Sequence, residues 1–201
     1  MAGLIVPFVL LRPLAAAPQD YLANAAGASL QIKAAVSLLF ANCALTIGIS
    51  VAAFRVFRRH GEAMALWLLT AGVTMFLLQA VDNVHVLSML SLSQQYAQAG
   101  GPDELFRALA ATVGSMRRWA HFTELFVIDC WIFLLYSALY RFRLVPRALA
   151  VFGLLTVVLH FAGIPLLGFL GYRIVTPMGV PMALSHMTLA VWLLTRGVRS
   201  R

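Results

Sequence analysis

The strongest constraint on the fold is the length of the uncharged apolar runs, which extend over about 20 residues between clusters of arginine. The chain has 201 residues, of which 62% are apolar and only 11% charged. A soluble domain has about a quarter of its residues charged. The runs therefore exclude a soluble globule, a disordered chain and a fibrous repeat, and they predict a membrane protein that crosses the bilayer several times.

The apolar runs predict an all-α fold, a single transmembrane helical bundle with about six spans. Gly100, Gly101 and Pro102 mark a turn, and Asp103 is the expected N-cap of a long helix that becomes fully apolar only at Trp119. A stretch rich in glycine and proline, "GFLGYRIVTPMGVP", is expected to connect the last two spans. The predicted spans are 2–14, 34–57, 63–90, 119–140, 148–170 and 182–195.

The first predicted span is short. Thirteen helical residues cover about 20 Å, whereas the hydrocarbon core of a bilayer is about 30 Å thick. The small residues of "PLAAAPQD" resemble a signal-peptidase site, but no basic residue precedes the apolar run, as a secretory signal requires. We therefore expect a short first helix rather than a cleaved signal.

Arginines set the expected orientation. With six spans, nine arginines fall on one side of the membrane and six basic residues on the other. We expect the protein in the inner (plasma) membrane of the cell. The positive-inside rule then predicts that both termini and the loops "RVFRRH" and "YRFRLVPR" lie in the cytoplasm. The net charge of +8 is explained by these span ends, and no solvated basic domain is present that would bind nucleic acid.

Seven ionisable residues fall within or at the rim of the predicted spans, where an aspartate costs about 2.5–3.5 kcal/mol at the helix centre. Such residues usually face the bundle interior and mark a functional site. Counting 1.5 Å per residue from the cytoplasmic helix ends separates them into an outer layer and a mid-membrane layer. The outer layer is Asp82, His85, His121 and Glu124; the mid-membrane layer is Asp129, His160 and His186.

The outer layer is a candidate metal site. The pairs in "DNVH" and "HFTE" are spaced i,i+3, so each carboxylate shares a helix face with its histidine. Imidazoles and carboxylates on facing helices can bind Zn, Mn or Fe. Too few carboxylates are present for a di-iron site, so the spacing predicts a single transition metal bound by Asp82, His85, His121 and Glu124. Arg117 lies one turn before His121 on nearly the same stripe.

The mid-membrane layer offers other chemistries. His160 and His186 are candidate axial ligands of a haem, such as haem b. Alternating acids and histidines also suit a proton relay. Asp82, Glu124 or Asp129 is a candidate general acid for an enzyme acting on a lipid or isoprenoid. A structural alternative pairs Asp129 with Arg118, three turns earlier, and each histidine alone is more often a packing residue than a ligand.

The C-terminal half resembles a family of bacterial multi-pass membrane proteins known only as a domain of unknown function. The resemblance is carried by "LYRFRLVPRALAVFGLL", by "PMALSHMTLAVWLLTRGV" and by the serine-rich "LSMLSLSQQYAQ", and it covers the chain from about Lys33. It implies a helical bundle with no assigned activity. Where the resemblance leads us to expect a glutamate in the last span, this chain has His186, which favours a metal or haem.

Together these features predict an integral membrane protein whose partners are the lipid bilayer and a metal, a haem or a small lipophilic molecule. Two alternatives remain open. One is a membrane-embedded enzyme that uses general acid chemistry on a lipid or isoprenoid. The other is a structural subunit of a membrane complex.

Overall fold

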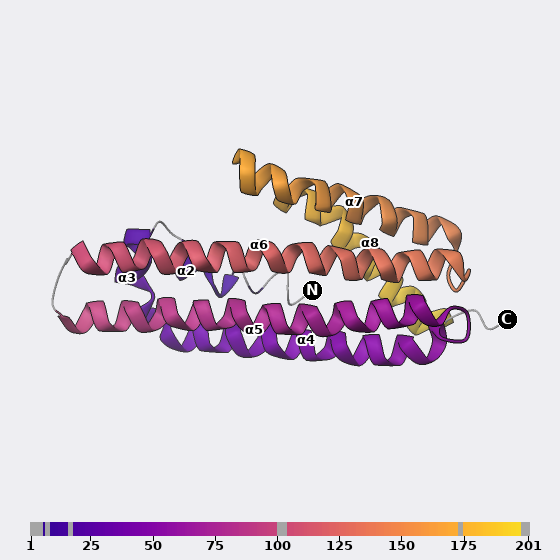
Figure 1. The fold of residues 1–201 in the computed structure, drawn as a ribbon, viewed down its shortest axis with the longest axis horizontal. Coiled ribbons are helices and arrows are strands. Elements are labelled where there is room, and N and C mark those ends of the chain that lie inside the picture. Colours follow the sequence, from indigo (N-terminus) through magenta and orange to yellow (C-terminus); the bar gives the residue numbers. More distant parts are fainter. Residues whose placement is uncertain (1–5, 7–8, 16–17, 100–103, 173–174, 198–201) are drawn as a thin grey trace. The chain divides into compact units, whose positions relative to one another are not determined.

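The structure is a computed structural model that describes residues 6, 9–15, 18–99, 104–172 and 175–197. Throughout these residues the ordered elements are helices, and no strand is present among them, as the apolar runs predict. Figure 1 shows the elements along the chain. They are α2 (Arg12–Ala15), α3 (Pro18–Asn24), the short 3₁₀ helix η1 (Ala26–Ala28), α4 (Ser29–Phe57), α5 (Glu62–Ala99), α6 (Glu104–Arg141), α7 (Arg147–Leu170) and α8 (Val175–Arg196).

Five of the described helices are long and apolar enough to cross a membrane. They correspond to the five later predicted spans, and their ranges are Ala26–Phe57, Glu62–Ala99, Glu104–Arg141, Arg147–Leu170 and Pro177–Arg196. The first predicted span, 2–14, falls partly on residues outside the described part of the chain. Its described residues, 6 and 9–14, are helical at Val6, at Val9 and in α2.

Two helices are longer than their apolar runs. Helix α5 continues from the predicted end at Leu90 to Ala99, because "SLSQQYAQ" contains polar residues but neither glycine nor proline. Helix α6 begins at Glu104, before its fully apolar part, as the sequence predicts; the expected cap, Asp103, lies outside the described residues. Each helix has 38 residues and is therefore about 57 Å long.

The predicted loop before the last span is shorter than expected. Helix α7 ends at Leu170, where Gly171 adopts a left-handed conformation with φ of 75°. Helix α8 already begins at Val175 and contains Pro181. Pro177 is accommodated because a residue in the first turn needs no intrahelical N–H bond, so a proline-rich segment can start a helix as well as end one.

The chain divides into two compact units, and α4, α5 and α6 each contribute to both. Unit 1 comprises Met1–Thr46 and Met75–Glu124; unit 2 comprises Ile47–Thr74 and Leu125–Arg201. Helices α7 and α8 belong wholly to unit 2, where they pack against each other. The candidate site residues of the outer layer therefore lie in unit 1, and those of the mid-membrane layer lie in unit 2.

The N-terminal segment packs into the core of unit 1. Val6, Leu11 and Leu14 are buried in one apolar cluster with residues of α3, α4, α5 and α6. The Tyr21 hydroxyl donates to the carbonyl oxygen of Ala110 at 3.1 Å, and burial raises the pKa of Tyr21 to about 12, so this donor stays protonated. The Ser93 hydroxyl donates to the Leu22 carbonyl at 2.7 Å. These contacts hold the segment that precedes α4 against the helices of unit 1.

The core of unit 2 depends on a close approach at Gly153. A Cβ atom at this position would overlap the ring of Tyr136, which is fully buried. The Tyr136 hydroxyl donates to the Ser185 hydroxyl at 3.1 Å, and Thr156 lies 3.3 Å from the same oxygen. The glycine on α7 thus lets a tyrosine from α6 reach a serine on α8, and the three helices are held together by one buried polar network.

Candidate metal site and a buried Asp–His pair

Helices α5 and α6 bring four charged or titratable side chains together in unit 1. Asp82 lies on α5, and Arg117, His121 and Glu124 lie on α6 at i, i+4 and i+7, which places the three on one stripe of that helix. The side chains of Asp82 and Glu124 are only 2% exposed, whereas that of His121 is 36% exposed. The two carboxylates are therefore buried, and the imidazole beside them is partly exposed.

The imidazole of His121 lies between the two carboxylates. Its Nδ1 is 3.6 Å from Oε2 of Glu124 and 3.9 Å from Oδ2 of Asp82. Nε of Arg117 is 3.6 Å from Oδ1 of Asp82. All of these distances are too long for hydrogen bonds, so four buried atoms have no hydrogen-bond partner in the described part of the protein. They are Asp82 Oδ1, Arg117 Nε, His121 Nδ1 and Glu124 Oε2.

Three of these side chains lie close enough to share one metal ion after small movements toward it. One donor atom each from Asp82, His121 and Glu124 lie within 4.8 Å of one another. Neighbouring ligands of a tetrahedral ion with bonds of about 2.0–2.2 Å are separated by roughly 3.3–3.6 Å. With both carboxylates ionised and the imidazole neutral, the guanidinium leaves one net negative charge, which a bound cation would compensate. Three protein ligands leave a fourth position for water or a substrate, as in catalytic zinc sites.

His85, the fourth predicted ligand, does not join this group. Its Nδ1 donates to the carbonyl oxygen of Val81 in the preceding turn of α5, at 2.8 Å. The i,i+3 spacing puts it near the face of Asp82, but it is not among the described residues whose donor atoms all lie within 4.8 Å of one another. The structure therefore brings together three of the four residues predicted from "DNVH" and "HFTE".

Two buried amides extend the polar stripe of α5. The amide nitrogen of Gln79 donates to the side-chain oxygen of Asn83 at 3.1 Å, and both residues are at most 5% exposed. Cys43 Sγ on α4 donates to the Gln79 side-chain oxygen at 3.8 Å. Sequence reasoning that considered only ionisable residues missed them. The signal is in "LLQAVDN", where two amides flank Asp82 within one helical turn.

In unit 2, Asp129 on α6 and His160 on α7 form a buried pair. Nδ1 of His160 lies 2.8 Å and 3.0 Å from the two carboxylate oxygens, and the residues are 1% and 8% exposed. The structural alternative, a pair between Asp129 and Arg118, is not what the structure contains. The Arg118 guanidinium lies over the ring of Trp119 instead, 5.7 Å from its centroid.

The two histidines considered as haem ligands have different surroundings. Nδ1 of His186 donates to the Met182 carbonyl at 2.8 Å, and its ring meets Tyr136 edge to face with centroids 5.4 Å apart. The outer edge of the His160 ring faces Gly179 of α8, where a Cβ atom would lie 3.6 Å from Nε2. That separation is an ordinary van der Waals contact, so α8 passes beside the ring edge that an axial ligand would present to iron.

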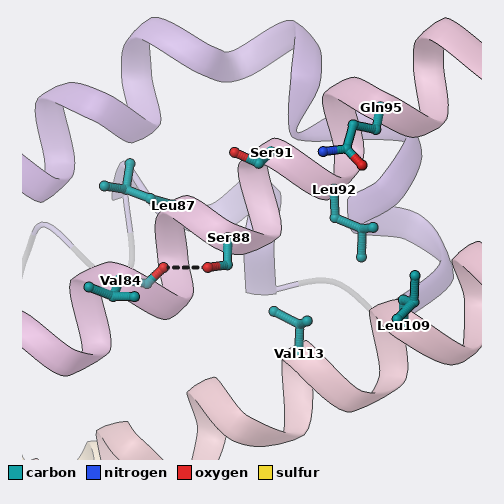
Figure 2. A pocket seen from close by; sticks show the side chains of 8 residues that line it. All are labelled: Val84, Leu87, Ser88, Ser91, Leu92, Gln95, Leu109 and Val113. Carbon is teal, nitrogen blue, oxygen red and sulfur yellow. Dashed lines mark hydrogen bonds between the residues drawn. The ribbon is translucent and has the colours of Figure 1, made fainter.

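An open groove lies along α5 and α6 in unit 1, with a volume of about 410 Å³. Figure 2 shows that Leu92 of α5 and Val113 and Leu109 of α6 project into the space between the two helices. Val113 is one turn before Arg117 on α6. The lining also contains Val84, Leu87, Ser88, Ser91 and Gln95. An elongated apolar group with a few hydrogen-bonding atoms would match this mixed lining.

The helices and the Asp–His–Glu group define a multi-pass helical membrane protein with a buried cluster of potential metal ligands. The chain belongs to the family described as a domain of unknown function (DUF4386), which matches residues 1–197. The resemblance predicted from the sequence is thereby confirmed and extends through the N-terminal segment. No curated protein and no solved structure matches the chain.

Proposed function

We propose that this protein binds one divalent transition metal ion through Asp82, His121 and Glu124, and that this ion is the centre of its function in the membrane. The observation that carries the proposal is the convergence of one donor atom each from Asp82, His121 and Glu124, all within 4.8 Å of one another, beside buried atoms of the same residues that have no hydrogen-bond partner. Ionisable residues inside membrane spans are costly and usually functional. His85 is not part of the proposed ligand set.

Arg117 acts as a positioning residue in this proposal. Its guanidinium compensates the charge of Asp82 from the side, 3.6 Å from the carboxylate, and restricts its orientation. We prefer the metal to a haem between His160 and His186, because buried atoms without hydrogen-bond partners belong to Asp82, His121 and Glu124, and none is described at those two histidines. The groove favours a second candidate, a small lipophilic ligand. If a lipid or isoprenoid copurified with the protein at stoichiometric amounts and no metal were present, the lipophilic ligand would be preferred to the metal.

The first prediction concerns metal content. Protein purified through a histidine-free tag, stripped with a chelator and reloaded with Zn²⁺ should retain about one ion per chain. Asp82→Asn and Glu124→Gln should each lower the affinity by about 10–100-fold or more, because each removes an anionic ligand. Elemental analysis after gel filtration measures the retained zinc.

Glu104→Gln is the matched control, since it makes the same substitution in an exposed residue of the same helix. It should retain zinc like the unaltered protein. Zinc that stays bound when Asp82 and Glu124 are both replaced would refute the assignment of the site.

The orientation we infer differs from the expectation of two cytoplasmic termini in the inner membrane of a bacterial cell. Five crossings place the segment before α4 and the end of α8 on opposite sides. Arginines cluster at the ends of α4, α6 and α8, which supports a cytoplasmic C-terminus and an N-terminal segment outside. The count of five rests on the described helices that are long and apolar enough to cross a membrane.

The second prediction tests this orientation by cysteine labelling. In a background without Cys43 and Cys130, a cysteine inserted after Met1 should react with an impermeant maleimide in intact cells. A cysteine replacing the exposed Arg59, just after α4, should react only after the membrane is permeabilised. The position of Arg59 is cytoplasmic with five crossings and with six, so it is the reference for a protected site. Protection of the N-terminal cysteine equal to that at position 59 would restore a first crossing before Arg12 and contradict the five-span orientation.

A further inference from the structure

A surface of unpaired positive charge lies where α4 and α6 end in unit 2. Phe142, which follows α6, contacts the loop after α4: its ring centroid is 6.1 Å from that of Phe57 and 5.1 Å from that of His60. The two loops are therefore held together by aromatic packing. We call the arginines that they carry the basic rim, which consists of Arg58, Arg59, Arg141, Arg143 and Arg147.

The charges of the basic rim have no acidic partners in the described part of the protein. All five arginines are exposed, and none lies within ion-pair distance of a described carboxylate. The guanidinium groups of Arg58 and Arg147 lie 6.0 Å from the ring centroids of Phe54 and Tyr140. Glu62 is the one acid in the adjoining helix ends, and the first turn of α7 has none. The rim is thus a dense positive surface at the end of apolar helices.

Arg143 has an unusual backbone conformation. Its φ is 55°, and it is the only described non-glycine residue with a positive φ. It follows α6 in a helix-ending turn, in which the Leu144 N–H donates to the Leu139 carbonyl at 3.1 Å. After α7 and α8 the chain uses Gly171 and Gly197 for the same left-handed conformation. An arginine here carries a conformational cost that glycine would avoid, so its side chain is expected to have a role.

We propose that the basic rim binds the phosphate headgroup of an anionic phospholipid and that Arg143 contacts this phosphate directly. Guanidinium groups bind phosphate oxygens through paired N–H donors, and several arginines beside a membrane span are typical of anionic-lipid sites. The apolar outer faces of the adjoining helices would contact the acyl chains. The site lies in unit 2 and is independent of the proposed metal site in unit 1.

The proposal is tested by native mass spectrometry of the purified full-length chain in detergent. The probes are phosphatidylglycerol, phosphatidylcholine with matched chains, and soluble glycerol phosphate. The unaltered protein should retain phosphatidylglycerol about tenfold better than phosphatidylcholine, and Arg143→Gln should remove most of that preference. Arg107→Gln, the same change at an exposed arginine near the start of α6, should leave it intact.

Arg143→Gly separates lipid binding from folding. Glycine adopts the left-handed turn without strain, so this variant should unfold at the same temperature as the unaltered protein or higher, and yet lose the lipid preference. Retention of phosphatidylglycerol by both Arg143 variants at the original level would overturn the proposal. Competition by glycerol phosphate at the same concentration as the lipid would also overturn it, because the ligand would then be a soluble phosphate.

Discussion

Replacing His160 by alanine is expected to destabilise the protein by about 3–5 kcal/mol. The change leaves the Asp129 carboxylate buried without the imidazole that now lies 2.8 Å from it, and an unpaired buried charge is strongly unfavourable. Thermal unfolding of the purified protein in detergent, followed by circular dichroism, measures the loss.

A double replacement distinguishes this effect from a lost packing contact. Removing Asp129 together with His160 eliminates the unpaired charge, so the double alanine variant should be more stable than His160→Ala alone. His85→Ala is a suitable control, because the Nδ1 of His85 bonds only to a carbonyl of its own helix. If His160→Ala and His85→Ala unfolded alike, the Asp129–His160 pair would not be an important contact of the fold.

Gly153→Val is expected to cost about 3 kcal/mol or more, or to prevent folding. The first added carbon would overlap the Tyr136 ring, and this ring is fixed by its hydrogen bond to Ser185 and by the edge-to-face contact with His186. The ring therefore cannot move aside without breaking the network between α6 and α8. The yield of monodisperse protein and its unfolding temperature measure the effect.

Gly48 provides the matched control, since nothing lies within 4 Å of a Cβ atom at this exposed helical position. Gly48→Val should be nearly neutral or slightly stabilising, because valine has a somewhat higher helix propensity than glycine. Gly153→Ala combined with Tyr136→Leu, which shortens the opposing side chain, should recover part of the stability lost in Gly153→Ala. A Gly153→Val protein as stable as the Gly48→Val protein would show that α6 and α7 are not so closely packed.

Much of the fold could be predicted from the sequence, because long uncharged runs can bury their backbone in a bilayer only as helices. Helix ends were less predictable. The run of apolar residues stops at Leu90, but α5 continues for nine residues because nothing before Gly100 interrupts its hydrogen bonds. The role of the N-terminal segment was also hard to predict. Apolar residues such as Leu11 and Leu14 are equally typical of a short span and of a protein core.

The candidate site could be predicted in part, for a geometric reason. Spacing along one helix places His121 and Glu124 on the same face, and a count of depth places Asp82 near them. Neither tells where a side chain points. His85 is not among the described residues whose donor atoms lie within 4.8 Å of one another, and Asp129 is paired with His160 rather than with Arg118 because the contact depends on how α7 packs against α6.

The metal site can be tested most directly by X-ray absorption of the protein loaded with Co²⁺, which replaces zinc in such sites and reports its ligands. We predict one imidazole nitrogen with carboxylate or water oxygens at about 2.0–2.2 Å, and loss of the imidazole signal in His121→Ala. His85→Ala should leave the spectrum unchanged. A cobalt ion whose spectrum is the same with and without His121, or a protein that binds no cobalt while folded, would contradict the proposed function.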